Sequence, residues 1–298
     1  MQDTSGPAED RRRLQIGVKP AQWDVDWPTL QATWELADEL PELDSAWLFD
    51  HFVAVKDRVP APQGAHEAMT TAAALAACTR RLRFGHLVLG NTYRHPALVA
   101  RMATTVDHIA GPRRFVLGLG AGWLEEEHRM FAWPYPSLGE RVSMLESAVR
   151  VIKEMWRHPD GASITASPYE LEAARTDPPP LTSGGPPVWL GVQGVRGIGI
   201  AARHADGWNW SGSVDQFVER RDQLMRACEG VGRDPAEIEI SAQISCFGRH
   251  AAEVLESAEA FVRSGVNHVI FAILTSEGPA GLRRLRDEVV APLRERYP

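Results

Sequence analysis

The sequence predicts an α/β fold, a (β/α)8 TIM barrel with an insertion before strand five. Three observations predict it. Eight short runs rich in apolar and β-branched residues recur along the 298 residues, and stretches with helical spacing separate them. The runs are continuously apolar, which is typical of parallel strands buried on both faces. The chain length also suits one barrel of this kind.

The apolar runs give the expected strands in chain order. Each is short enough for a barrel strand, and each is followed by a more polar stretch. The expected strands are Leu14–Val18, Ala46–Phe49, Leu82–Leu89, Arg114–Leu119, Val188–Val192, Gly207–Trp210, Ile238–Ile244 and Val266–Leu274.

Helical spacing occupies the intervals. After Leu138, apolar residues recur at alternating steps of three and four up to position 156, which describes one face of a long helix. Pro96 suits the first turn of the helix after strand three. Ser213, with Gln216 three residues later, predicts the start of another helix, and a further one begins near Ala251.

One interval is too long for a simple connection. Residues 157–187 are rich in Pro, Gly and Ser, and barrel strands continue after them. We interpret this stretch as an insertion before strand five rather than a linker, so residues 14–298 form a single catalytic domain. Residues 1–13 are polar, lack the apolar segment of a secretory signal, and are expected to form a flexible tail.

Composition and charge narrow the class of protein. Hydrophobic residues make up 44% and charged residues 24%, as in an ordinary globular protein. The net charge of −7 disfavours a nucleic-acid partner. Apolar stretches fall short of the 18 or so residues that a membrane helix needs. We therefore expect a cytoplasmic protein that acts on a small molecule, without nucleic-acid or membrane partners.

Metal and disulfide chemistry receive no support from the sequence. The cysteines, Cys78, Cys228 and Cys246, are far apart and form no CxxC pair. The histidines do not cluster with metal-ligand spacing, and HExxH is absent. We expect no metal site.

The barrel prediction indicates where catalytic residues lie, because barrel enzymes place them at the carboxyl ends of the strands. Asp50-His51 follows strand two, where a histidine beside a carboxylate can act as proton donor or acceptor, although it can also be an ordinary loop residue. Arg94, next to Tyr93 after strand three, could bind an anion or brace the loop against a carboxylate.

Two glycine-rich turns follow strands four and five. Gly118-Leu-Gly-Ala-Gly122 fails the dinucleotide fingerprint, but its glycines would let a flat ring approach the backbone, with packing as the alternative. Gly191-Val-Gln-Gly-Val-Arg-Gly197 opens a helix over Ile198–His204, whose amino end and Arg196 could hold a phosphate; an ordinary turn is the alternative.

Several further residues fall at the predicted mouth. Lys19 and Gln22 follow strand one, and Glu127 follows strand four. Trp23, Trp123 and Trp210 could form the wall of an aromatic pocket. The predicted substrate pocket consists of Lys19, Gln22, Trp23, Tyr93, Arg94, Trp123, Glu127 and Trp210.

Six segments taken together resemble the bacterial luciferase-like oxidoreductases, in particular the branch that uses the deazaflavin coenzyme F420. The segments run in order over residues 14 to about 245. They are Gly17-Val-Lys-Pro-Ala-Gln-Trp23, Trp47-Leu-Phe-Asp-His-Phe52, Leu87-Val-Leu-Gly-Asn-Thr-Tyr-Arg-His-Pro96, Leu117-Gly-Leu-Gly-Ala-Gly-Trp123 with Glu127, Ala201-Ala-Arg-His-Ala-Asp-Gly-Trp-Asn209 and Gly232-Arg-Asp-Pro235.

The resemblance implies a cofactor site and a mechanism. Asp50 and His51 would lie against the cofactor ring, with His51 near the reacting carbon as proton donor or acceptor. A bulge at Leu87-Val88, with a non-proline cis peptide, would support the rear face of the ring. Gly120, Ala121 and Gly122 would flank the ring, and Gly191, Val192, Gln193, Gly194, Val195 and Arg196 would hold the phosphate.

The implied activity is hydride transfer between F420 and a small organic substrate, by reduction of C=C or C=N or by oxidation of an alcohol. A homodimer is also implied. Members of the family usually have two adjacent glycines after strand five, whereas Gly191 is followed here by Val192-Gln193. The alternatives are an FMN-dependent monooxygenase, a non-catalytic flavin-binding barrel, and an unrelated barrel enzyme for phosphorylated substrates.

Overall fold

The computed structural model describes residues 13–53 and 64–298. The predicted tail, apart from Arg13, lies outside the described residues. Over the described residues, no helix combines the length and the apolarity needed to cross a membrane.

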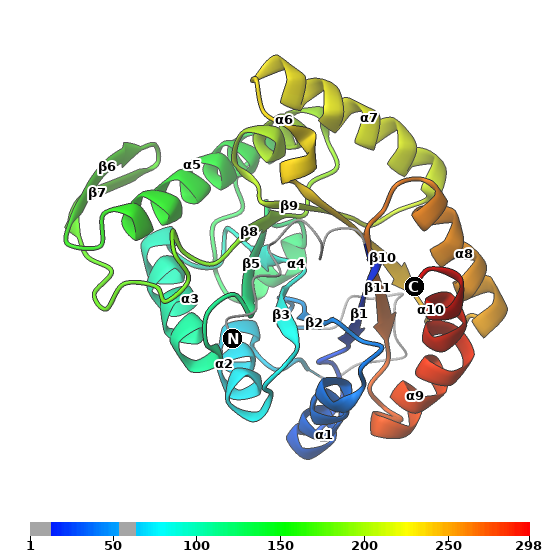
Figure 1. Cartoon of the computed structure of the whole chain (residues 1–298). Helices are drawn as coiled ribbons and strands as arrows, with labels where there is room; N and C mark the ends of the chain where they lie inside the picture. Colours follow the sequence, from blue (N-terminus) through cyan, green and yellow to red (C-terminus); the bar gives the residue numbers. More distant parts are fainter. Residues whose placement is uncertain (1–12, 54–63) are drawn as a thin grey trace, which may run out of the picture.

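A closed ring of parallel strands confirms the predicted TIM barrel (Figure 1). Every neighbouring pair around the ring is parallel, and β1 pairs with both β2 and β11 to close it. All eight predicted strands are present, the third divided into β3 and β4. The barrel strands are β1 (Gln15–Pro20), β2 (Ser45–Leu48), β3 (Arg83–His86), β4 (Leu89–Gly90), β5 (Phe115–Gly120), β8 (Val188–Leu190), β9 (Gly207–Trp210), β10 (Glu239–Ser245) and β11 (His268–Ile273).

The break between β3 and β4 falls at Leu87-Val88, whose peptide bond is cis. β3 pairs with β5 through Phe84 and Gly85, and β4 pairs with β5 again through Leu89 and Gly90. The expected bulge with a non-proline cis peptide is therefore confirmed.

The helices lie outside the ring, except for the short α4 at the mouth of the barrel, and several of their first turns follow local sequence signals. α3 begins at Pro96, and the Ser213 side chain accepts a hydrogen bond from the amide of Gln216 at the start of α7, both as predicted. The helices are α1 (Trp27–Glu39), α2 (Ala68–Cys78), α3 (Pro96–Ala110), α4 (Glu125–Met130), α5 (Leu138–Arg157), α6 (Val195–His204), α7 (Val214–Gly230), α8 (Ala251–Arg263), α9 (Gly278–Leu285) and α10 (Ala291–Arg296), with a 3₁₀ turn at Pro235–Glu237 and a π-helical turn at Arg286–Val290.

Strand side chains alternate between two cores. In β1, Ile16 and Val18 pack outward against the helices, while Gly17 faces the barrel interior beside Ser45 and Trp47. The interior contains a small apolar cluster in which the rings of Trp47 and Trp189 stack with their centres 4.7 Å apart. This packing fills the barrel below its catalytic end, so that ligand-binding groups can lie only at the strand ends and in the loops.

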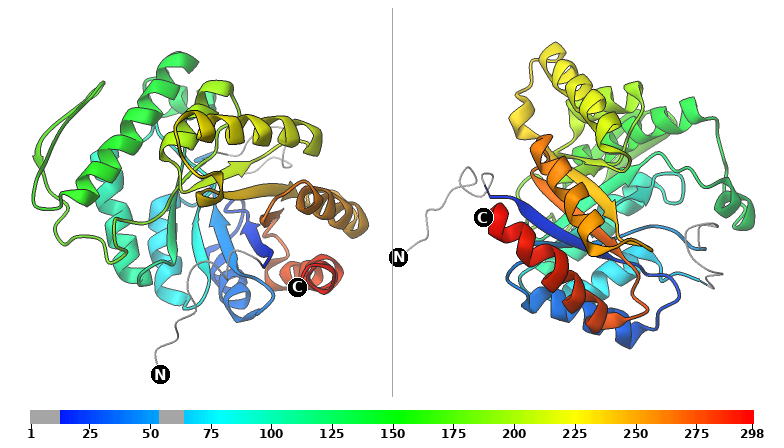
Figure 2. Two further views of the ribbon diagram at one scale, coloured as in Figure 1. Left: turned by 45° about the horizontal axis from the view of Figure 1, so that its top comes forward. Right: turned by 90° about the vertical axis from the view of Figure 1, so that its right-hand side faces the viewer.

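The insertion before strand five contains regular structure that its composition did not predict. β6 (Ala162–Ala166) and β7 (Tyr169–Ala174) form an antiparallel hairpin beside α5, seen at the edge of the molecule in Figures 1 and 2. Alternate residues of β6 are buried, which is why a strand this short is stable against the helix. The Tyr169 ring also meets His95 edge to face at 5.3 Å.

Candidate active site

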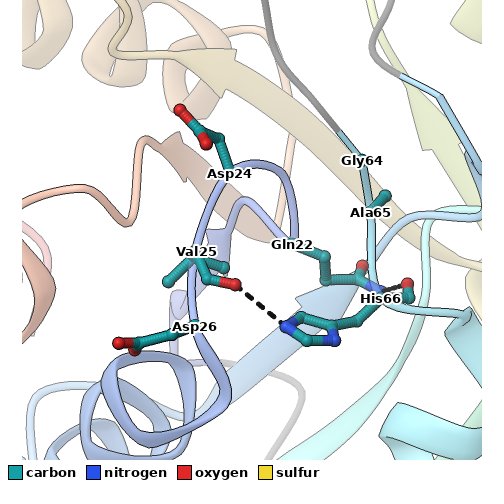
Figure 3. Close-up of a pocket in the computed structure, with 7 residues that line it drawn as sticks. All are labelled: Gln22, Asp24, Val25, Asp26, Gly64, Ala65 and His66. Carbon is teal, nitrogen blue, oxygen red and sulfur yellow. Dashed lines mark hydrogen bonds between the residues drawn. The ribbon is translucent and has the colours of Figure 1, made fainter.

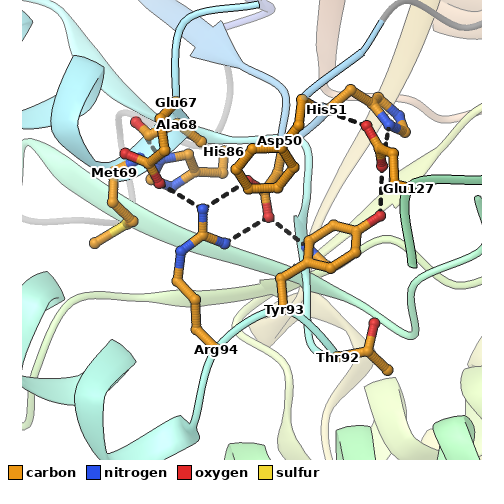
Figure 4. A network of polar contacts seen from close by, with 12 residues as sticks. Asp50, His51, Glu67, Ala68, Met69, His86, Thr92, Tyr93, Arg94 and Glu127 are labelled. Carbon is orange, nitrogen blue, oxygen red and sulfur yellow. Dashed lines mark hydrogen bonds and ion pairs between the residues drawn. The ribbon is translucent and has the colours of Figure 1, made fainter. Parts of the chain in front are cut away.

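His51 and Glu127 form the centre of the candidate site (Figure 4). His51 follows β2 and Glu127 lies in the short helix after β5, so both come from the carboxyl ends of barrel strands. His51 Nδ1 lies 3.2 Å from Glu127 Oε2. The Glu127 side chain is fully buried, whereas 17% of the His51 side chain is exposed. The histidine therefore reaches solvent and the carboxylate supports it from within.

Four hydrogen bonds hold the Glu127 carboxylate. Its Oε1 accepts from the amides of Phe52 and Val53 at 2.6 and 3.2 Å, and its Oε2 accepts from Tyr93 Oη at 2.6 Å as well as from His51. Burial alone would raise the pKa of Glu127, but the hydrogen bonds from His51 and Tyr93 outweigh burial and lower the pKa below 4.5. Burial and the bond to Glu127 raise the pKa of Tyr93. At neutral pH the pair is a carboxylate and a neutral phenol.

An ionised Glu127 determines which histidine nitrogen carries hydrogen. A carboxylate can only accept, so the His51 Nδ1 must be the donor in their hydrogen bond. The remaining ring nitrogen, Nε2, is then the one that can accept a proton. Glu127 also stabilises the imidazolium that such a transfer creates.

Asp50 and Arg94 form a second ionic cluster beside the first (Figure 4). Arg94 donates to both Asp50 oxygens at 2.8 and 2.9 Å, and the Gly90 amide donates to Asp50 Oδ2 at 2.9 Å. Arg94 also pairs with Glu67, whose side chain caps the start of α2. Of the two roles considered for Arg94, the structure supports bracing of the loops against carboxylates.

His86 lies close to this cluster and is completely buried. Its Nε2 donates to the Ala68 carbonyl at 3.3 Å, and its Nδ1 has no partner among the described residues. Burial lowers the pKa of His86 to about 4, so the ring is neutral at physiological pH.

Aromatic rings surround His51. The Trp123 ring meets it edge to face with centres 5.6 Å apart, and the rings of Phe49 and Trp23 lie at 6.0 and 6.3 Å. Trp23 and Trp123 therefore take positions consistent with the predicted pocket wall.

Trp210 requires a correction. Its side chain is buried in the core outside the barrel, against the rings of Trp208 and Phe217. Alternation along β9 turns Asn209 inward and Trp210 outward, so Trp210 does not line the mouth with Trp23 and Trp123.

Gln22 and Lys19 have partners within the protein. Gln22 is buried and bonds to the Phe49 amide and the His66 carbonyl. Lys19 faces the barrel interior, donates to the Gln243 side chain, and is linked through it to Asn209. The side chains of both residues therefore hold neighbouring strands and loops at the barrel mouth together.

A cavity of about 390 Å³ lies between the loop after β1 and the segment before α2 (Figure 3). Two aspartates are among the residues that line it. The lining residues are Gln22, Asp24, Val25, Asp26, Gly64, Ala65 and His66.

The glycines at the carboxyl ends of β5 and β8 make room for protein side chains. A Cβ atom at Gly120 would lie 2.6 Å from Val88 Cγ2, and one at Gly191 would lie 2.9 Å from Val88 Cγ1. A Cβ at Gly122 would lie 2.5 Å from Thr92 Oγ1. These close approaches show that the glycines serve packing within the protein, and the half-buried Val88 lies between the two glycine turns.

The amino end of α6 is open. Gly194 occupies the capping position, and because glycine has no side chain, no side-chain oxygen caps the first amides of the helix. Residues 193–196 are exposed. Val192 is buried and packs toward Gly197, while Gln193 donates to the Ser211 carbonyl. The departure from two glycines therefore leaves the first turn of α6 accessible. Arg196 itself bonds to Gly139 and Ser143 of α5.

Metal-binding geometry is not found in the part of the chain that the structure describes. There, His, Cys, Asp and Glu side chains do not form a group of three or more that could hold an ion.

The whole barrel matches one protein family. The model of the luciferase-like monooxygenase family matches residues 15–294. The chain belongs to this family. The resemblance noted in the sequence is thereby confirmed at the level of the family.

Individual relatives share less than a third of their residues with this chain over the matched regions. An F420-dependent glucose-6-phosphate dehydrogenase of Kineococcus radiotolerans is 28% identical over 262 residues, which cover 86% of this chain and 74% of the relative. A phthiodiolone/phenolphthiodiolone dimycocerosates ketoreductase of a Mycobacterium species is 29% identical over 215 residues; the match covers 66% of this chain but only 55% of the relative. An F420-dependent secondary alcohol dehydrogenase, solved with an F420-acetone adduct, superposes with a TM-score of 0.82 at 17% identity, covering 94% of this chain and 99% of that one.

Sequence reasoning missed three residues of this arrangement. Glu67 precedes an alanine-rich helix, and its position was a capping signal that could have been recognised. Gln243 lies at an inward position of β10, and His86 lies at the end of β3, directly before the bulge. Their partners are distant in the chain, so spacing alone carried no signal for either.

Proposed function

We propose that the chain is a coenzyme F420-dependent oxidoreductase that transfers a hydride between the deazaflavin and a small organic substrate. The observation that carries the proposal is the His51–Glu127–Tyr93 chain of hydrogen bonds. It places a histidine with a defined tautomer at the carboxyl ends of the barrel strands. The F420-dependent relatives named above support the choice of cofactor.

The described residues fit such a cofactor in two respects. The half-buried Val88 at the bulge offers an apolar surface that would support one face of a flat ring. The open first turn of α6 offers amide donors, and a helix amino end carries about half a positive charge, which suits a phosphate. Gly120, Ala121 and Gly122 would flank the ring, and Gly191 to Arg196 would hold the phosphate.

When bound, a deazaflavin supplies a carbon that accepts or gives up a hydride. The chain's own contribution is the proton. His51 Nε2 would take the proton from a substrate hydroxyl, or return one to a reduced substrate, while Glu127 stabilises the charged ring. Asp50 would hold His51 and the bulge in register through Arg94 and the Gly90 amide.

A turnover assay tests the proposal against an oxygen-using monooxygenase. Purified protein is mixed with F420 and a panel of secondary alcohols, with and without oxygen, and the deazaflavin absorbance is followed. We expect F420 reduction at the same rate in both conditions. Substrate conversion that occurs only with reduced FMN and oxygen would contradict the proposal and support the monooxygenase alternative.

A further inference from the structure

Apolar side chains are concentrated on one part of the barrel mouth. Trp123 and Phe131, both in the segment after β5, are 53% and 44% exposed, and Met130 is 54% exposed. Exposed aromatic side chains that gather beside a reactive group are a common sign of a binding surface. We call Trp123, Met130 and Phe131, together with Phe52 and Trp133, the aromatic rim.

The aromatic rim is continuous with the reactive histidine. The Trp123 ring contacts the His51 ring, and Phe52 directly follows His51 in the chain. Phe52 packs against Phe131 and Trp133 with ring centres 5.3 and 5.0 Å apart. A substrate whose oxygen meets His51 would therefore place its carbon skeleton against these rings.

The charges near His51 disfavour an anionic substrate. Arg94 is already paired with Asp50 and Glu67. Arg141 lies over the Tyr135 ring, 4.0 Å from its centre, and donates to the Gly122 carbonyl. A phosphorylated substrate would have to break these contacts to bind either of these two arginines.

Carboxylates near the mouth also disfavour an anionic substrate. Glu127 is ionised behind His51, and Asp24 and Asp26 line the cavity next to Trp23. The negative charge of Glu127, in contact with His51, repels a phosphate monoester but has little effect on a neutral ring.

We infer that the substrate class is a neutral aromatic or other planar apolar alcohol, or the corresponding ketone, held with its ring on Trp123 and its oxygen at His51. The inference rests on the proposed function. In the oxidative direction His51 Nε2 would take the proton of the hydroxyl, and the carbinol carbon would give up a hydride with its two electrons, so that the C–O bond becomes C=O. A bound deazaflavin would supply the hydride acceptor.

Equilibrium binding tests this inference without relying on turnover. The affinities of acetophenone and glucose 6-phosphate are measured by calorimetry on the F420-loaded protein and on the protein without cofactor. We expect acetophenone to bind at least tenfold more tightly than the sugar phosphate. Trp123→Ala should weaken acetophenone binding about three- to tenfold, the value of one aromatic contact, and Trp123→Phe should restore most of it.

Ile109→Ala is the matched control, because Ile109 is 44% exposed in the last turn of α3, at the opposite end of that helix from the loop that follows β4. It should leave both affinities unchanged. Equal or tighter binding of glucose 6-phosphate, or acetophenone binding that Trp123→Ala does not alter, would overturn the inference. Acetophenone binding that depends on Trp123 in a protein that neither binds nor turns over F420 would uphold the substrate class and refute the proposed function.

Discussion

Two parts of the barrel rim satisfy their polar groups in opposite ways. Around His51, both oxygens of Glu127 and both oxygens of Asp50 accept hydrogen bonds from the protein. At α6, Gly194 makes no capping bond and residues 193–196 are exposed. The contrast teaches that a proton-transfer site needs fixed geometry before the substrate arrives, whereas an anion can itself complete the hydrogen bonding of an open helix end.

The part of the rim around His51, where the protein fixes every carboxylate oxygen of Glu127 and Asp50, is called the fixed side, and the part at α6 the open side. The largest expected effect comes from removing His51, the proposed proton acceptor, on the fixed side. His51→Ala should lower the turnover of F420 with a secondary alcohol by about 10²–10⁴, because proton transfer would lose its acceptor. Cofactor affinity, measured by fluorescence titration, should stay within a few-fold of the wild type. A loss of less than tenfold with cofactor binding intact would remove the proton role from His51.

Arg94→Met would disrupt the fixed side through its ionic cluster. The Asp50 side chain is 1% exposed, so the change leaves a buried carboxylate without its cation. We expect a decrease of about 3–5 kcal/mol in the free energy of unfolding, measured with denaturant. Arg101→Met, which removes only an exposed bond to the Asp177 carbonyl, is the control and should cost less than about 1 kcal/mol. Similar losses in both variants would contradict this account of Arg94.

His86 makes the fixed side sensitive to acid. Its folded pKa of about 4 lies below the ordinary 6.5, so the unfolded chain binds more protons and this contribution to stability falls as the pH drops from 6.5 toward 4. Relative to His86→Gln, the wild type should lose about 2–3 kcal/mol over that range. Parallel stability curves for the two proteins between pH 6.5 and 4 would show that His86 is not held neutral.

Glu127→Gln tests the tautomer. A glutamine keeps the shape but removes the charge that orients and stabilises the histidine, so turnover should fall about 10–10² while F420 affinity changes little. Because the pKa of this carboxyl is lowered, Glu127 stays ionised in the wild type down to a pH below its ordinary value of 4.5. Wild-type turnover in the glutamine variant would contradict the role given to the pair.

The open side gives the smallest effect. A Cβ at Gly194 would meet no atom within 4 Å, so a substitution there fits. Gly194→Asp caps α6 with a negative charge and should weaken F420 binding about tenfold, whereas Gly194→Asn, a neutral cap, should keep it within about threefold. Equal affinities in the two variants would mean that no anion binds at this helix end.

The sequence predicted the barrel because its signals are local. Continuous apolar runs, Pro96 at a helix start and Ser213 at a helix cap each depend on neighbouring residues. The position of His51 followed from the same order of strands. The hairpin of β6 and β7 escaped prediction because Gly and Pro in the segments that flank it make the whole insertion resemble an irregular loop.

The partners of the site residues could not be predicted. Glu127 meets His51 across 76 positions and Arg94 meets Asp50 across 44, distances over which spacing carries no information. The prediction that Trp210 lines the mouth was wrong for a different reason. Side chains alternate along a strand, so an error of one residue moves a side chain from the barrel interior to the outer core.

A pair of fluorescence titrations of the wild-type protein, one with coenzyme F420 and one with FMN, distinguishes the two cofactors. We predict tight binding of F420 and much weaker binding of FMN. Preferential binding of FMN, or binding of neither, would contradict the claim that this barrel holds a deazaflavin beside His51.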